Sequence, residues 1–253
     1  MLFARSHSIK YPRRNKIKYF LAVVLYLILN FSALSAQNLN GFNGLILIPN
    51  AEIPEQGRLT FGVNYLDKLS NPFSGYEKDG YTYYVNLSFL PFLEFHGQIL
   101  RNVKEGINQG VGDRSISLRL KPFSETEYIP SLLIGWQNIG TVFGGETAIH
   151  NHSLYFVATK NFYVSNRLNA EITGGYGTKL MKSGDYQFQG LFGGMELNSS
   201  LVTHYLSLSL LAEYDAEWFN AGARVILFNH VNFLFGFLDL KYLSGGMSLS
   251  FEL

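Results

Sequence analysis

The sequence predicts an all-β protein, a transmembrane antiparallel up-and-down β-barrel of about 12 strands. Three observations support this prediction. Beyond Gln37, apolar and polar residues alternate with a period of two almost throughout, which indicates half-buried strands. The connections between the strands alternate between long and short. Apolar residues make up 47% and aromatic residues 15% of the chain, but only 15% are charged, against the usual quarter.

The alternation and the turn signals between its runs define the predicted strands. In chain order we expect strands over Arg58–Leu66, Tyr81–Phe89, Leu93–Arg101, Arg114–Lys121, Pro130–Asn138, Ser153–Lys160, Leu168–Thr178, Gln187–Leu197, the two arms of a hairpin within Tyr205–Leu227, Val231–Leu240 and Tyr242–Leu253. Together these strands assign residues 58–253 to one barrel domain.

The two faces of the predicted strands differ in chemistry. In the hairpin, Leu206 and Leu208 alternate with Ser207 and Ser209. The apolar phase is rich in Phe, Tyr and Leu, which suits a lipid belt, whereas Ser, Thr, Asn, Gly, Glu and Arg on the other phase suit a small wet lumen. A secreted β-sandwich with a filled core is the alternative. Faces stay unassigned in three strands that are apolar on both phases, those beginning at Ser153, Gln187 and Val231.

The connections indicate how such a barrel is oriented. Long loops rich in glycine and charge follow the first four odd strands, for example DKLSNPFSGYEKDG, and mostly shorter turns follow the even strands. The last two odd connections, YDAE and the tip at Leu240, are short exceptions. Long loops on one side, and short turns with both termini on the other, are typical of outer-membrane barrels. We therefore expect periplasmic termini.

The N-terminus has the pattern of a secretory signal peptide, predicted over residues 1–36. Six basic residues precede the apolar run YFLAVVLYLIL, and the small residues SALSAQ follow it. The run is about half the ~20 residues that a spanning helix needs. Cleavage after Ser35 or after Ala36 fits the pattern, and an uncleaved short anchor is the alternative.

Residues 37–57 form a separate segment between the signal and the first strand. It contains GLILIPNAEIPEQG, in which Pro49 and Pro54 exclude a regular central strand. Two placements remain open: a plug folded into the mouth of the barrel, or a periplasmic extension along its rim.

Composition excludes several classes of protein. The chain has no cysteine, so it has no disulfide scaffold, Cys-based zinc site or lipid anchor on a cysteine. The six basic residues that precede the first acid, Glu52, leave 14 basic and 19 acidic residues in the rest of the chain. A mildly acidic mature protein is not a predicted partner of nucleic acid.

Several segments resemble the YjbH-like family of bacterial outer-membrane proteins linked to exopolysaccharide production. These are Gly44–Val63, Arg119–Gly140 with PSLLIGWQNIG, Ser153–Phe162, and Leu210–Val225 with its E-Y-D hairpin. The resemblance touches most of the chain after the signal and corresponds to a single short module of the family. It implies a β-barrel with a role in making, exporting or attaching surface polysaccharide.

Charged side chains on the polar phase form the candidate site. Because unpaired buried charges are costly, acidic and basic groups inside one narrow lumen should pair. The pairs would either form a structural plug of salt bridges or line a polar passage that contacts sugar. By its phase Trp218 points into the lumen and could stack on a sugar, although packing in an interfacial girdle is the alternative. The lumen cluster comprises Arg58, Glu94, His96, Arg119, Glu171, Glu213 and Arg224.

Two further clusters carry side chains that could do chemistry. Asp215 and Glu217 flank a hairpin tip, where a solvated turn explains them better than the carboxylate pair of a glycosidase. Glu146, His150 and His152 include a His-x-His pair, but further ligands at a known spacing are missing. We therefore predict no catalytic residue, no metal and no cofactor.

The functional prediction is a non-enzymatic barrel of the bacterial outer membrane that assists production or export of exopolysaccharide or capsule. A narrow porin-like passive channel is the alternative, and an outer-membrane enzyme is a third possibility. Expected partners are outer-membrane lipid, the barrel assembly machinery, polysaccharide and periplasmic export proteins. The apolar last strand, ending in MSLSFEL, suits recognition by the assembly machinery.

Overall fold

The computed structural model describes residues 36–67, 79–102, 113–141, 152–165, 167–178, 187–200 and 205–253. The predicted signal peptide lies outside the described residues except for Ala36, as does most of each predicted long loop. Within the described residues, no helix is long and apolar enough to cross a membrane.

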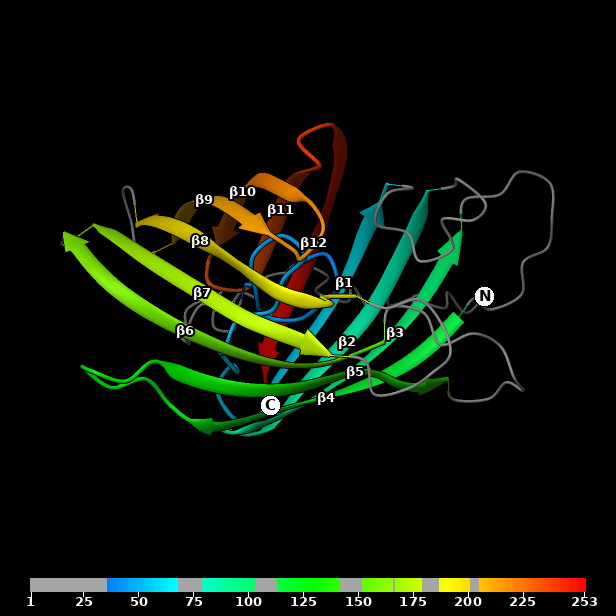
Figure 1. Ribbon diagram of the computed structural model, residues 1–253, viewed down its shortest axis with the longest axis horizontal. Helices are drawn as coiled ribbons and strands as arrows, with labels where there is room; N and C mark the ends of the chain where they lie inside the picture. Colours follow the sequence, from blue (N-terminus) through cyan, green and yellow to red (C-terminus); the bar gives the residue numbers. More distant parts are fainter. Residues whose placement is uncertain are drawn as a thin grey trace, which may run out of the picture. The chain divides into compact units, whose positions relative to one another are not determined.

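The described residues form twelve β-strands (Figure 1). Their bounds are β1 Arg58–Leu66, β2 Gly80–Leu90, β3 Leu93–Asn102, β4 Asp113–Phe123, β5 Ser131–Thr141, β6 Ser153–Ser165, β7 Leu168–Thr178, β8 Gly190–Ser200, β9 Leu206–Tyr214, β10 Phe219–Leu227, β11 Val231–Leu238 and β12 Tyr242–Glu252. The predicted all-β class and strand number are confirmed.

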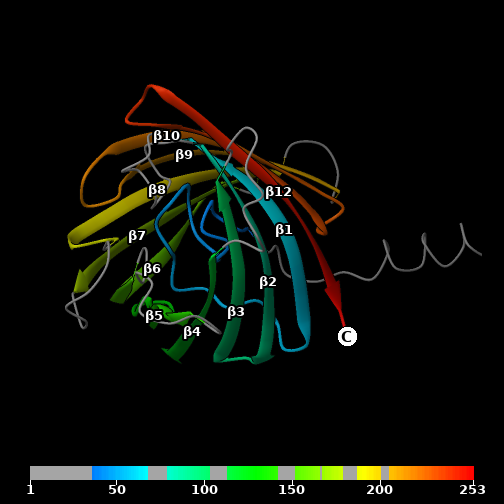
Figure 2. The ribbon, with the colours of Figure 1, turned by 90° about the vertical axis from the view of Figure 1, so that its right-hand side faces the viewer.

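Each strand pairs antiparallel with its neighbours in sequence, and β1 pairs with β12, so that the sheet closes into a barrel (Figure 2). The closing register runs from Arg58 opposite Glu252 to Tyr65 opposite Gly245. Because every strand has two partners, the sheet leaves no edge with unpaired backbone groups. A sheet can lie in lipid only under this condition.

Several predicted strand bounds differ from the structure by a few residues, and the start of β8 is the clearest case. The strand predicted to begin at Gln187 begins at Gly190 instead. Phe188 has a φ of 55° and Gly190 a φ of 99°, values that an extended strand does not contain. The chain therefore bends before β8, and the Phe188 ring turns into the buried core, where it is 2% exposed.

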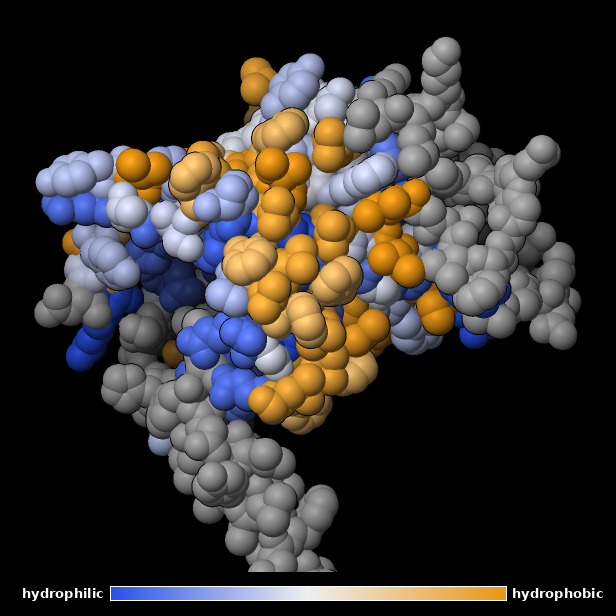
Figure 3. All heavy atoms as spheres, turned by 90° about the horizontal axis from the view of Figure 1, so that it is seen from below, coloured by the Kyte–Doolittle hydropathy of each residue, from blue (hydrophilic) through white to orange (hydrophobic). Residues whose placement is uncertain are grey.

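The outward face of the barrel is apolar. Phe61 is 48% exposed, Phe156 50% and Leu210 66%, and Figure 3 shows hydrophobic residues gathered over a broad area of one face. A continuous exposed surface of this kind is unfavourable in water but suits contact with hydrocarbon.

The inward face is not a simple wet lumen. Polar residues such as Thr60, Asn64 and Ser117 are buried on it, as the alternation predicted. However, residues 37–54 lie inside the barrel, and every residue from 37 to 51 is buried (Figure 2). Of the two placements left open for this segment, the structure has the one inside the barrel. We refer to residues 37–54 as the plug.

The plug explains the strands that are apolar on both phases. Tyr155 and Val157 of β6, Phe192 of β8, and Leu234 and Leu238 of β11 point inward and belong to one buried apolar cluster with the plug. These strands have an apolar outer face for the surrounding medium and an apolar inner face for the plug.

Tight turns on two sides of the barrel also store some strain. At the β11–β12 connection, Asp239 and Leu240 have φ values of 50° and 55°, and the Lys241 amide donates to the Leu238 carbonyl over 3.0 Å. This is the two-residue hairpin turn with positive φ at both central positions, which normally favours glycine at the second. Leu240 occupies that position with its side chain 62% exposed.

Replacing Leu240 with glycine should therefore stabilise the barrel, by about 0.5–1 kcal/mol, because the relieved strain exceeds the entropy that glycine loses. The measurement is the urea midpoint of unfolding in detergent, followed by the heat-modifiable shift on a gel. Lys241→Gly, at a position without positive φ, should give no gain. An unchanged or lower midpoint for Leu240→Gly would contradict the assignment of strain.

Candidate functional site

The candidate site is the interface between the plug and the inner wall of the barrel. Among the described residues, the backbone-to-backbone hydrogen bonds that residues 38–50 donate go to carbonyls within residues 36–48, for example from Leu39 to Ile46 over 2.7 Å and from Asn50 to Asn43 over 3.1 Å. These bonds satisfy only some of the backbone N–H and C=O groups of the plug. Because a buried, unpaired peptide group is costly, the rest must be satisfied by the wall.

Glu213 of β9 binds the amide groups at the plug's tip. Its Oε2 accepts hydrogen bonds from the amides of Ile46 (2.8 Å) and Ile48 (3.4 Å), and its Oε1 accepts one from Leu47 (2.8 Å). Asn220 of β10 donates its side-chain amide to the same Oε1 over 3.0 Å. The carboxylate thus binds an irregular turn much as a helix N-terminus or backbone nest binds an anion.

Arg224 of β10 binds the carbonyl groups of the same tip. Its Nη2 donates to the carbonyls of Gly44 (2.5 Å) and Leu45 (2.7 Å), and its Nη1 contacts Glu196 of β8 at 2.5 Å. Arg224 is 1% exposed. Its charge is therefore neutralised by one wall carboxylate while its Nη2 holds the plug.

Arg119 of β4 binds a second point on the plug. Its Nη1 is 2.6 Å from Glu94 Oε2 of β3, and both side chains are fully buried. Its Nη2 donates to the carbonyls of Asn50 (2.6 Å) and, at longer distances, Asn43 (3.4 Å) and Glu52 (3.2 Å). The guanidinium also lies 5.7 Å from the centre of the Phe42 ring.

Neutral side chains complete the polar contacts around the barrel. The Asn64 amide of β1 donates to the carbonyls of Asn38 (3.1 Å) and Leu39 (2.8 Å). Thr159 Oγ1 of β6 accepts from the Ala51 amide over 2.8 Å. Further contacts run from Asn86 of β2 to Gly41, from Asn50 to Glu171 of β7, from Asn232 of β11 to Gln37, and from Ser248 of β12 to Gln37.

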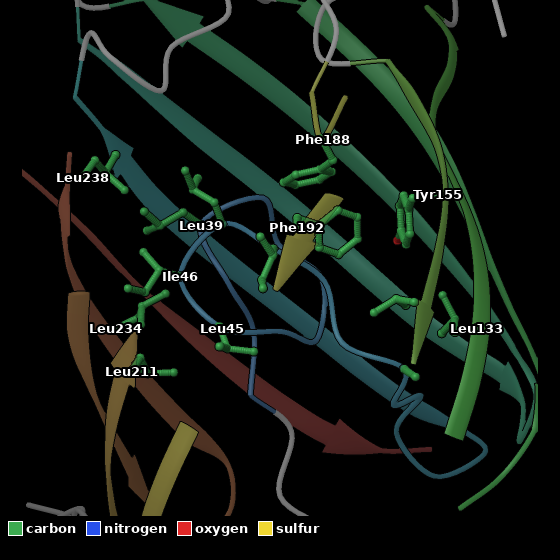
Figure 4. Packing of buried hydrophobic residues seen from close by; sticks show 14 of the residues in the cluster. Leu39, Leu45, Ile46, Leu133, Tyr155, Phe188, Phe192, Leu211, Leu234 and Leu238 are labelled. Atoms are coloured by element: carbon green, nitrogen blue, oxygen red, sulfur yellow. The ribbon is translucent and has the colours of Figure 1, made fainter. Parts of the chain in front are cut away.

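Apolar side chains of the plug fill spaces between these polar contacts. Leu39, Leu45, Ile46 and Ile48 are 0% exposed, and burial of each contributes about 1.5–3 kcal/mol. Figure 4 shows Leu45 and Ile46 near Leu211 of β9 and Leu234 of β11, and Phe188, Phe192, Tyr155 and Leu133 on the other side of the plug. Apolar packing therefore contributes much of the free energy that keeps the plug in place.

Glycines on the inner wall make room for the plug's tip. A Cβ atom on Gly236 of β11 would lie 2.6 Å from Ile46 Cγ2, and one on Gly222 of β10 would lie 3.1 Å from Ile46 Cδ1. A Cβ on Gly194 of β8 would lie 2.6 Å from Leu45 Cδ2. Any larger residue at these positions would compete with the plug for the same volume.

The remaining predicted lumen residues also face the interior. His96 of β3 contacts Asn86 through Nδ1 (2.5 Å) and Gln98 through Nε2 (3.3 Å), and its ring centre lies 4.3 Å from that of Phe42 in the plug. Arg58 lies at the barrel closure, 3.3 Å from Glu252 of β12. Glu171 is half-buried and accepts a hydrogen bond from Asn50 over 3.0 Å.

The predicted pairing of acidic with basic side chains in the lumen is found only in part. Arg119 pairs with Glu94, but Arg224 pairs with Glu196, a residue that sequence reasoning missed because β8 is apolar on both phases. Glu213 contacts plug amides rather than an arginine. The missed signal was the plug itself, since an irregular segment rich in Asn and Gly needs both donors and acceptors from the wall.

The hairpin-tip residues have local structural roles. Asp215 Oδ1 accepts hydrogen bonds from the amides of Glu217 (3.0 Å) and Trp218 (2.7 Å), and its Oδ2 accepts one from Asn220 (2.9 Å). Asp215 therefore closes the β9–β10 turn, in which the half-buried Trp218 lies between the two strands.

The predicted His-x-His cluster is described only at His152. Its Nε2 accepts a hydrogen bond from Trp136 Nε1 over 3.0 Å, while Glu146 and His150 lie outside the described residues. The described residues contain no group of three or more His, Cys, Asp or Glu side chains placed to hold a metal.

Fold and site together define a closed twelve-stranded barrel whose interior is filled by its own N-terminal segment. The model of the YjbH family, described as exopolysaccharide biosynthesis protein YbjH, matches residues 36–236. The match includes both the plug and most of the barrel, and the protein belongs to this family. The family resemblance predicted from sequence is confirmed.

Two of the solved structures that resemble the chain are a porin and an outer membrane channel. A KdgM porin is 7% identical with a TM-score of 0.49, covering 78% of this chain and 99% of that chain. An outer membrane channel from Pseudomonas putida F1 is 11% identical with a TM-score of 0.41, covering 82% of this chain and 100% of that chain. Neither likeness bears on function at this level of similarity. No curated protein matched the chain.

Replacing Glu213 with Gln should loosen the plug. The neutral amide would place an NH₂ group against backbone donors, at a cost of about 1–3 kcal/mol. We expect faster protease cleavage within residues 37–54 of the folded protein and a lower urea midpoint. The matched control is Glu217→Gln, four residues further along the chain in the β9–β10 turn, where the side chain is exposed; it should leave both readouts unchanged. Equal protease resistance of the two variants would contradict the anchoring role of Glu213.

Replacing Gly236 with Val should have a similar effect through volume rather than charge. The added methyl groups would occupy the space of Ile46, and such overpacking costs about 1–3 kcal/mol. Gly174→Val on the outer face is the control, because a Cβ there meets nothing within 4 Å. The expected result is plug cleavage by protease in the Gly236 variant only. Resistance of Gly236→Val would show that Ile46 does not depend on this space.

Proposed function

We propose that this protein is a non-enzymatic β-barrel of the bacterial outer membrane that assists the production or export of exopolysaccharide. Membership of the YjbH family, which covers residues 36–236, is the observation that carries the proposal. The closed sheet and its apolar outer face support insertion into a membrane.

The placement of the termini supports an outer-membrane location and the expected partners. The first strand begins and the last strand ends at the same rim, where Arg58 lies opposite Glu252. The short β10–β11 turn is on this rim as well. In outer-membrane barrels the short-turn rim faces the periplasm. The proposed partners are outer-membrane lipid around the barrel, the assembly machinery during insertion, and polysaccharide with periplasmic export proteins at the rim.

The contacts of the interior charges support assistance rather than catalysis. Three charged side chains of the interior hydrogen-bond to the plug backbone: Glu213, Arg119 and Arg224. A general acid or base needs to reach a proton on a substrate. In the plugged barrel these groups instead contact peptide groups of the same chain.

The plug also weighs against an always-open porin. A passive pore needs a continuous water-filled lumen, whereas residues 37–51 are buried inside this one. We expect the resting protein to be closed to ions.

Deleting the gene should reduce secreted or cell-attached polysaccharide, and the purified wild-type protein should give no steady conductance in planar bilayers. The first measurement is the sugar content of the matrix, with complementation by the full-length chain as the control. Normal matrix in the deletion strain would refute the proposed role. Steady wild-type conductance with normal matrix would favour the passive channel.

A further inference from the structure

We propose that the plug is displaceable, and that the passage it leaves carries a neutral, hydroxyl-rich carbohydrate chain. The identity of the carried chain rests on the proposed function. The displaceability of the plug rests on the structure of the interface alone.

The barrel is complete without the plug. β1 pairs with β12 directly, so no strand of the sheet depends on residues 37–54 for a partner. The isolated bridges of this segment, Gln37 with Asn43 and Gly44 with Pro49, are internal to it. Removing the plug from the lumen would therefore break side-chain contacts but no part of the described sheet.

The plug enters and leaves the barrel at the same rim. At its start, Gln37 contacts Asn232, the second residue of β11, next to the short β10–β11 turn. At its end, Gly57 donates its amide to the Ser88 carbonyl and accepts from the Leu253 amide, at the closing rim of β1 and β12. A segment held at both ends on one side can move out as a loop without threading through the barrel.

Gly57 is suited to be the hinge of this movement. Its φ is 82°, in the region that favours glycine, and it is the last residue before β1. Glu55 and Gln56, which precede it, are exposed. The backbone can therefore change direction here without disturbing the first strand.

The wall beneath the plug has the chemistry of a carbohydrate-binding surface. It binds peptide groups with alternating donors and acceptors: Arg119, Arg224 and Asn64 donate, whereas Glu213 and Thr159 accept. Hydroxyl groups of a sugar both donate and accept, as peptide groups do together. The plug thus occupies the hydrogen-bonding positions that a passing sugar chain would need.

The charge of the wall favours a neutral chain over an acidic one. The arginines at 119 and 224 are each paired with a wall glutamate. Glu213 and Glu171 contact only the plug and neutral neighbours among their described bonds. Displacing the plug would also separate Lys121 of β4 from its plug partner Glu52, 3.3 Å away. The two carboxylates outnumber this one lysine, so the passage would gain net negative charge and would repel a polyanion.

A disulfide can lock the plug in place. A Cβ atom on Gly236 would lie 3.8 Å from Ile46 Cβ, which is the usual separation across a disulfide. The chain has no cysteine of its own. The double variant Ile46→Cys/Gly236→Cys therefore places one removable crosslink between the plug tip and β11.

The test compares oxidised and reduced forms of this full-length double variant in planar bilayers, in urea too dilute to unfold the barrel. Urea weakens apolar burial and so favours displacement. We expect brief ion-conducting openings at least ten times more frequent after reduction than before. The single variants Ile46→Cys and Gly236→Cys are the controls, and their openings should not respond to the reductant. Equal opening frequencies in the two redox forms, or openings in neither, would overturn the displaceable plug.

The ion selectivity of the openings, and their block by sugar oligomers, test whether the carried chain is neutral. In a KCl gradient the reversal potential of the openings should show preference for potassium over chloride, and Glu171→Gln should reduce it. Neutral dextran oligomers should interrupt the current at lower concentration than oligomers of galacturonic acid. Anion preference, or stronger block by the acidic oligomers, would overturn the assignment of a neutral chain.

A cellular measurement separates this inference from the proposed function. If the deletion strain lacks matrix and the oxidised double variant restores it as fully as wild type, the proposed function holds and plug displacement is overturned. If the reduced double variant and the single variants restore matrix but the oxidised double variant does not, both the proposed function and plug displacement hold. If deletion leaves the matrix normal, the proposed function fails, and the bilayer result alone decides whether the plug moves.

Discussion

The structure depends on one constraint: the peptide groups of an irregular segment buried inside a closed barrel must find hydrogen-bond partners. Sheet hydrogen bonds are unavailable to the plug, because every barrel strand already pairs on both sides. Side chains of the inner wall supply these partners. Glu213 accepts hydrogen bonds from amide groups, and Arg119 and Arg224 donate to carbonyl groups. Charges that look misplaced in a buried interior are thereby accounted for, since each replaces the partners that a peptide group would have in water.

The same constraint shapes the apolar part of the interior. An anchored plug brings Leu45 and Ile46 to a fixed position on the wall, and glycines at 222 and 236 leave space there. β6, β8 and β11 are therefore apolar inside as well as outside. The barrel has two apolar surfaces of different kinds: one buried against the plug, and one exposed on the outside.

The YjbH family is described by exopolysaccharide biosynthesis, and the filled lumen bears on the role that we propose. In the proposed role, the filled barrel keeps the membrane sealed and provides a polar path when the plug is displaced. The hydrogen-bonding side chains that hold the plug are of the type that would also contact a sugar chain, so sealing and transport would draw on one set of residues.

How far the sequence could be interpreted differs between the sheet and its contents. Alternation along the strands, such as that of Leu206 and Leu208 with Ser207 and Ser209, predicted the inward set from Arg58 to Arg224, because the side-chain direction of a strand has a period of two. Together with the alternating loop lengths and the composition, it predicted the antiparallel barrel. The same rule gave no answer for Tyr155, Phe192 and Leu234, where both phases are apolar. It also could not pair Arg224 with Glu196, since strand periodicity states which face a residue occupies but not which residue lies across the lumen.

By itself, then, the sequence determined the approximate strands, the faces of those that alternate cleanly, and the family, because these depend on local periodicity and on residue type. Only the tertiary structure decided that residues 37–54 lie within the barrel and that Glu213 holds them by the amides of Ile46 and Leu47. Those contacts join positions more than 160 residues apart in the chain. No local pattern encodes them, because they exist only when the closed sheet brings its inner wall around the plug.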